Sequence, residues 1–217
     1  MSTLTRAATP TTSTRTLLAC GVAAGPLFTG VSLLQVLARD GFDLGRHPLS
    51  LLSLGDAGWV QIANFAVTGV LSLGFALGLR LSPVSGWAGR WGPRLYGGFG
   101  LGLVLGGVFV TEPSDGFPPG AADGSASWHS LVHDVVAGVA IDLALVSCLL
   151  LARRFRRARE AGWAAYSLLT GVAGLTLSWW PDPDGISVRL AAVVVLVLAW
   201  ATATATRLLA APVGLGA

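Results

Sequence analysis

Lysine is absent from the sequence, cysteine occurs only twice, and charged residues of all kinds are scarce. Charged residues make up 12% of the 217 positions, whereas soluble domains carry about 25%. Hydrophobic residues make up 53%, and the mean hydropathy of the chain is +0.69. The shortage of charge excludes an ordinary soluble domain. The composition predicts an integral membrane protein whose partners are membrane lipids.

All basic residues are arginine, and the net charge is +3. A nucleic-acid-binding protein would gather its arginines in one patch on a soluble surface, but here they are spread over the segments between apolar stretches. We therefore expect no nucleic-acid partner. Abundant Ala, Gly, Leu and Val without lysine suggest a high-GC bacterial genome. We accordingly expect the protein in the bacterial cytoplasmic (inner) membrane.

Six stretches are apolar enough to cross a membrane, which takes about 20 residues of helix. They span residues 17–37, 60–79, 95–110, 131–152, 163–180 and 188–209, and the third and fifth are short. We expect an all-α integral membrane fold with six transmembrane helices. Residues 17–209 would form a single domain, between an N-terminal cytoplasmic tail (1–16) and a C-terminal tail (210–217).

The gaps between these stretches differ in charge, which predicts their orientation. Most arginines, including those of the RRFRRARE run at 153–160, lie in alternate gaps. The positive-inside rule places these gaps and both termini in the cytoplasm. Cys20 and Cys148 then lie toward the cytoplasmic ends of their helices, so we expect no structural disulfide. Carboxylates gather in the outer gaps: Asp40, Asp43, Asp56, Glu112, Asp115, Asp123, Asp182 and Asp184.

The first outer loop, RDGFDLGRHPLSLLSLGDAGW, is long and partly apolar. Pro48 favours the start of a short helix, and the leucines between 49 and 54 give that helix an apolar surface. Gly55 would end it, and Asp56 would cap the next membrane helix. We expect a short interfacial helix lying over the bundle.

Each outer loop also contains an Asp-Gly pair followed by an apolar residue, at 40–42, 115–117 and 184–186. The three tripeptides could be the trace of three helical hairpins built alike. They could equally be ordinary Asp-Gly turns, and we favour this interpretation.

Glycines recur four residues apart in two of the apolar stretches. Gly74 and Gly78 lie on one face of the second stretch, and Gly98, Gly102 and Gly106 lie on one face of the third. Small residues at this spacing let helix backbones approach closely. We expect tight packing within the chain, with homodimerisation as the alternative.

Polar residues in the second stretch also share one helix face. Gln61, Asn64, Thr68 and Ser72 are three or four positions apart, and such a face should look into the bundle rather than at lipid. Hydrogen bonding between helices is the slightly favoured interpretation. The alternative is substrate binding by Gln61 and Asn64, together with Trp59 and Asp142.

The fourth stretch opens with WHSLVHD, which places His129 and His133 one helical turn apart and Asp134 next to the second histidine. Two turns deeper lies Asp142. A carboxylate at that depth costs about 2.5–3.5 kcal/mol, so it should be protonated, paired or beside water. Partners for it could come from Gln61, Asn64 or a polar residue of the fifth stretch.

Two interpretations of the histidines stay open. In the first, the imidazoles cap a helix by binding loop carbonyls at the membrane surface. In the second, His129 and His133 are ligands of a divalent metal such as zinc. His47, Asp56 or another acidic loop residue would then complete the three protein ligands that catalytic zinc takes.

Long motifs of the chain resemble a known family. HPLSLLSLGDAGWVQIANFAVTG, TEPSDGFP and HSLVHD are similar to the bacterial membrane family catalogued as domain of unknown function 998. The resemblance covers most of the chain. It implies a six-helix membrane protein and supplies no activity.

A second, much weaker resemblance is to membrane hydrolases of the alkaline-ceramidase and adiponectin-receptor type, which bind zinc through Ser, Asp and His residues. It implies His129 and His133 as ligands, with Ser50 or Ser53 and Asp56 as further candidates. In that group the histidine pair lies near the C-terminus of seven helices, and here it opens the fourth of six.

Three functions compete on this basis. The first is an enzyme acting on a lipid or isoprenoid-like substrate from an outer-facing pocket, by hydrolysis with a metal-bound water or by acid–base cyclisation or isomerisation. Its candidate catalytic residues are His47, Asp56, Asp115 and Asp134. The second is a small-solute transporter with a polar path through Gln61, Asn64 and Asp142. The third is a non-catalytic membrane scaffold.

Overall fold

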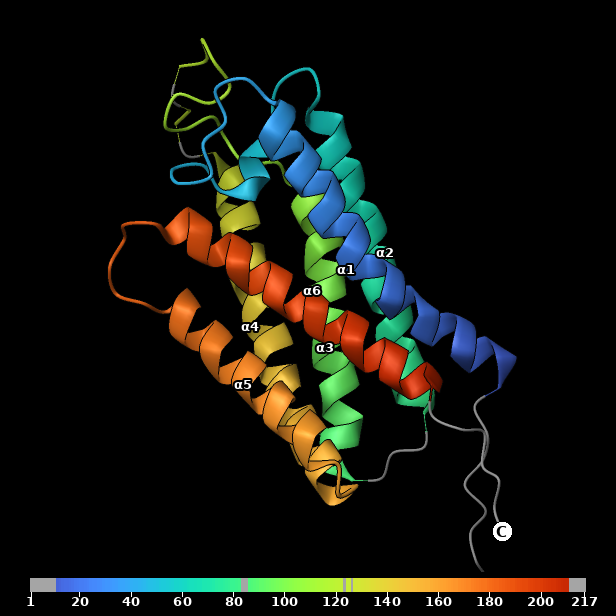
Figure 1. Cartoon of the computed structure of the whole chain (residues 1–217). Coiled ribbons are helices and arrows are strands. Elements are labelled where there is room, and N and C mark those ends of the chain that lie inside the picture. The colour runs from blue at the N-terminus through green and yellow to red at the C-terminus, as the bar shows by residue number, and fades with distance from the viewer. Residues whose placement is uncertain (1–10, 83–85, 123, 126, 211–217) are drawn as a thin grey trace, which may run out of the picture.

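A computed structural model of the chain describes residues 11–82, 86–122, 124–125 and 127–210. Within them lie six α-helices and one short 3₁₀ helix (Figure 1). Their order is α1 (Thr12–Ala38), η1 (Leu49–Ser53), α2 (Gly58–Leu81), α3 (Trp87–Val108), α4 (Trp128–Arg157), α5 (Ala161–Ser178) and α6 (Ile186–Ala210). Each predicted span therefore falls on its own helix, and the third and fifth spans run two residues past the ends of α3 and α5. Helix α1 begins inside the predicted N-terminal tail, and residues 1–10 and 211–217 of the two tails lie outside the described residues.

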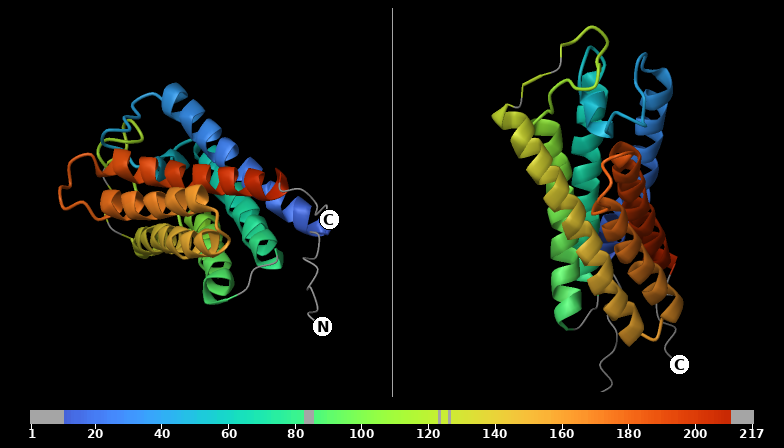
Figure 2. Two further views of the ribbon diagram at one scale, coloured as in Figure 1. Left: turned by 60° about the horizontal axis from the view of Figure 1, so that its bottom comes forward. Right: turned by 90° about the vertical axis from the view of Figure 1, so that its left-hand side faces the viewer.

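The helices form a closed ring in which consecutive helices are neighbours and α1 packs against α6 (Figures 1 and 2). Helices α4 and α6 approach each other only slightly across the ring. The loops α1–α2 and α3–α4 lie together at one end of the bundle, at the top of Figure 1. The start of α1, the end of α6 and the α4–α5 turn lie at the other end.

Four of the helices, α1, α2, α4 and α6, are long and apolar enough to cross a membrane. Helices α3 and α5 are long enough but less apolar: α3 contains many glycines and two arginines, and the 18 residues of α5 include several glycines, serines and threonines. The chain is therefore a multi-pass membrane protein. Crossing by α3 and α5, and the cytoplasmic placement of both termini, stay predictions.

Glycine determines how closely the helices pack. A Cβ added at Gly102 would lie 2.3 Å from the Ala140 Cβ atom of α4, and one added at Gly78 would lie 2.8 Å from the Leu18 backbone nitrogen of α1. Packing within the chain is thus confirmed as a role for these glycine faces. The sequence did not reveal a further close crossing of α2 and α3, where the backbones of Gly69 and Gly100 face each other.

The short helix after Pro48 is confirmed as η1, and the side chains of Leu51 and Leu52 are buried beneath it. Gly55 follows with a positive φ of 70°, which ends the segment. The expectation that Asp56 caps the next helix is wrong. The N-cap of α2 is Ala57, no side chain caps it, and Asp56 is exposed to solvent.

Candidate functional site

His47, which is fully buried, holds the α1–α2 and α3–α4 loops together. Its Nδ1 atom accepts a hydrogen bond from the backbone N–H of Asp43 at 2.9 Å. Its Nε2 atom lies 3.1 Å from the carbonyl oxygen of Asp115 in the α3–α4 loop. Because a carbonyl oxygen only accepts, Nε2 carries the ring hydrogen. Both nitrogens of the imidazole thus bind backbone groups, and the His47 side chain joins the α1–α2 loop to the α3–α4 loop.

An aromatic cluster surrounds His47. Phe42 and Phe117, the third residues of two Asp-Gly tripeptides, pack edge to face with their centroids 5.2 Å apart. The guanidinium of Arg39 lies 5.3 Å from the centre of the Phe117 ring and donates to the carbonyls of Leu52 and Leu54. The glycines of all three tripeptides have positive φ, as a turn requires. This supports the turn interpretation, and the turns bring two phenylalanines together.

His133 is the histidine that faces the inside of the bundle, and it is 96% buried. Its Nδ1 atom lies 2.7 Å from the carbonyl oxygen of Phe109, the C-cap residue of α3. Nδ1 must therefore donate, which leaves the lone pair of the neutral ring on Nε2. Among the described residues Nε2 has no hydrogen-bond partner.

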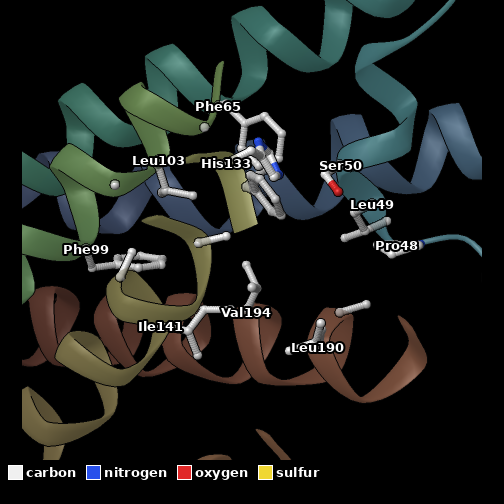
Figure 3. Close-up of a pocket in the computed structure, with 16 residues that line it drawn as sticks. Pro48, Leu49, Ser50, Phe65, Phe99, Leu103, His133, Ile141, Leu190 and Val194 are labelled. Carbon is white, nitrogen blue, oxygen red and sulfur yellow. The ribbon is translucent and has the colours of Figure 1, made fainter. Parts of the chain in front are cut away.

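Nearly all of the surroundings of this ring are apolar. His133 lines a cavity of about 110 Å³ inside the ring of helices, between η1 and α1, α2, α3, α4 and α6 (Figure 3). Its walls include Phe28, Phe65 and Phe99. Apart from His133, Ser50 of η1 is the only residue of the lining with a polar side chain. An apolar cavity of roughly 150 Å³ stays dry and holds benzene, so this one suits a group of a few carbons.

The cavity borders a second hollow that faces the side of the bundle. The two hollows share Ile141 of α4 and Leu190 of α6 as lining residues. The second hollow, of about 130 Å³, is also lined by Asp142 and Trp179. Trp179 Nε1 donates to Asp142 Oδ1 at 3.2 Å. The carboxylate is thus paired, with a tryptophan at the end of α5 rather than with the polar residues we had expected.

The polar face of α2 binds α1. Gln35 Nε2 donates to Gln61 Oε1 at 2.7 Å, and Asn64 Nδ2 donates to Ser32 Oγ at 3.2 Å. Thr68 extends this network through Asn64 Oδ1. Hydrogen bonding between helices is therefore confirmed for this face. Gln61 and Asn64 do not line the cavity, and they form no continuous path with Asp142.

The remaining candidates lie on the surface. Asp56, Asp115, His129 and Asp134 are exposed, as is Trp59 at 68%. None of them, nor His47, lines the cavity beside His133. His129 packs against the Trp128 ring instead, with centroids 3.6 Å apart.

Within the described residues, the side chains do not fit a catalytic metal. The part of the chain that the structure describes contains no group of three His, Cys, Asp or Glu side chains placed to hold a metal ion. Catalytic zinc takes three protein ligands. His133 bonds the Phe109 carbonyl, as the loop-carbonyl interpretation expected, whereas among the described residues the His129 side chain has no such bond.

An all-α bundle of long apolar helices, with two loops packed together at one end and an apolar cavity among the helices, defines a multi-pass membrane protein. The chain belongs to the family described as Protein of unknown function (DUF998), whose model matches residues 22–207. That range runs from the first helix into the last. The comparisons with curated proteins and with solved structures gave no match.

Proposed function

We propose that this chain is a membrane enzyme that takes the apolar end of a lipid or isoprenoid-like substrate into the bundle cavity and uses His133 Nε2 as its proton acceptor. One observation carries the proposal. A single titratable side chain, His133, lines a cavity whose only other polar side chain is Ser50, and a backbone hydrogen bond fixes the orientation of the imidazole.

The chemistry follows from the tautomer. With the hydrogen on Nδ1, the Nε2 lone pair accepts a proton from an O–H or an activated C–H group of the substrate, or from a water. The Phe109 carbonyl, 2.7 Å from Nδ1, stabilises the imidazolium that forms. Return of the proton to another atom isomerises the substrate, whereas deprotonation of water leads to hydrolysis. A general base of this kind contributes about 10²- to 10⁴-fold in rate.

The substrate class follows from size and charge. A cavity of about 110 Å³ holds a few carbons, such as one prenyl unit or the end of an acyl chain. The outer arginines are engaged elsewhere: Arg46 pairs with Asp43, and Arg189 donates to the carbonyls of Asp182 and Asp184. With no arginine in the cavity lining, a neutral hydroxyl or amide fits beside Nε2 better than a phosphate does.

Access for such a substrate is proposed from the membrane, between α4 and α6. Ile141 and Leu190 separate the cavity from the side hollow, so a modest movement of these two side chains joins the two spaces. Asp142 and Trp179 would then border the mouth. This supports a role for Asp142 in substrate contact, at the edge of the site.

The test uses membrane lipid extract, because it needs no prior choice of substrate. Purified protein is incubated with the extract in D₂O, and the lipids are compared by untargeted mass spectrometry. We expect at least one neutral lipid to change mass, by deuterium uptake or by reaction, with wild-type protein and not with His133→Asn. No change that depends on His133 would contradict the proposal.

A further inference from the structure

A second apolar hollow lies at the other end of α4. It is a groove of about 700 Å³ between α4 and α5, two helices that run side by side in Figure 2 (right). Its apolar lining comes from every third or fourth residue of each helix: Val146, Leu149 and Leu150 on α4, and Ala165, Leu168 and Val172 on α5. The groove shares no lining residue with the His133 cavity.

Two arginines line the groove near the α4–α5 turn. Arg153 and Arg156 are both exposed. Among the described residues neither guanidinium group forms a hydrogen bond or an ion pair. The carboxylate nearest in sequence, Glu160, pairs instead with Arg207 of α6 at 3.5 Å. The groove thus combines a row of apolar side chains with two guanidinium groups that have no ion-pair partner among the described residues.

We propose that this groove binds an anionic phospholipid, with the phosphate at Arg153 and Arg156 and an acyl chain between α4 and α5. Guanidinium groups bind phosphate oxygens through paired, charge-assisted hydrogen bonds. The aliphatic side chains and small alanines leave room for a hydrocarbon chain of the same molecule. A water-soluble anion would bind the two guanidinium groups but would leave the apolar side chains of the groove uncovered.

The site goes beyond the proposed function, because His133 and the groove lie at opposite ends of α4. It assigns a specific place to lipid along the arginine-rich segment. Each arginine near an anionic surface contributes about 1 kcal/mol of attraction, so losing both should weaken binding roughly thirtyfold.

The test is lipid titration of the full chain in neutral detergent, followed by native mass spectrometry. The probes are dioleoyl phosphatidylglycerol, dioleoyl phosphatidylcholine and glycerol phosphate. Arg153→Ala/Arg156→Ala removes the two charges of the groove. Arg157→Ala/Arg159→Ala is the matched control, because it removes the same charge from the same segment and neither residue lines the groove. Ala165→Trp fills the apolar length without changing the charge.

We expect phosphatidylglycerol to bind wild-type protein and the control, and to bind Arg153→Ala/Arg156→Ala roughly thirtyfold more weakly. Ala165→Trp should also weaken its binding. If phosphatidylglycerol binding weakens equally in both double variants, the arginines act only through general surface charge, and this result would overturn the proposal. So would equal binding of phosphatidylcholine, or binding of glycerol phosphate as tight as that of the whole lipid.

Discussion

His133 donates its Nδ1 hydrogen to the carbonyl oxygen of Phe109 across 2.7 Å, and this bond ties the first turns of α4 to the end of α3. The same bond leaves Nε2 as the only ring atom able to accept a proton. The structural and chemical roles of His133 thus use different nitrogens. They can be separated by substitution.

His133→Asn should keep the fold and lose the function. The asparagine amide N–H can replace Nδ1–H as donor to Phe109, but it offers no base at the position of Nε2. His133→Ala should in addition destabilise the protein by about 1–3 kcal/mol, because the Phe109 carbonyl loses its partner. Thermal unfolding in detergent measures the stability of both variants, and the lipid assay in D₂O measures their activity. Activity retained in His133→Asn would show that Nε2 is not the base.

Gly106→Leu should block ligand binding with little effect on stability. A Cβ added at Gly106 meets only His133 Cε1 within 4 Å, at 3.8 Å, so the larger side chain would grow into the cavity. Gly30→Leu is the control, since a Cβ there meets nothing within 4 Å and Gly30 does not line the cavity. We expect stabilisation by a neutral prenol to disappear in Gly106→Leu alone. Equal stabilisation of both variants would place the ligand elsewhere.

His47→Ala should loosen the outer loops without removing a group that touches substrate. It deletes one acceptor for Asp43 N–H and one donor to the Asp115 carbonyl. The expected loss of unfolding free energy is about 1–3 kcal/mol. Hydrogen exchange should accelerate at Asp43 and around Phe117, while the centre of α4 stays protected. An unchanged exchange pattern would mean that His47 does not join the loops.

Gln61→Ala should weaken the packing of α1 on α2. The Gln61 side chain accepts from both Gln35 and Asn64. Hydrogen bonds between membrane helices contribute on average about 0.6 kcal/mol and at most about 1.7, so a loss in this range is expected from controlled unfolding. Val67→Ala, on the exposed face of the same helix, is the control. A loss of lipid turnover with unchanged stability would instead favour a substrate-binding role for Gln61.

The helices could be predicted from the sequence because hydropathy is a local property. The predicted stretch 60–79 became α2 at Gly58–Leu81, and Pro48 marked the start of η1. The polar face of α2 also pointed into the bundle as its spacing required. Its partners Ser32 and Gln35 were missed, although their spacing of three positions places them on one face of α1.

The cavity could not be predicted. Phe28, Phe99 and Leu190 have the same apolar character as residues that fill the core, and only the packing of the helices leaves space between them. The sequence likewise could not distinguish the surroundings of His47 from those of His133. Their difference lies in which backbone groups meet each ring, and these belong to loops distant in sequence. The pairing of Asp142 with Trp179 depends in the same way on where α5 ends.

The most direct test of the central claim is photo-crosslinking of wild-type protein with a fifteen-carbon prenol that carries a diazirine at its apolar end, followed by peptide mapping. We predict adducts on cavity residues such as Leu103, Ile141 and Val194, with their yield lost in Gly106→Leu and kept in Gly30→Leu. Adducts confined to outward-facing residues such as Val70 and Leu169, with equal yield in both variants, would contradict the account.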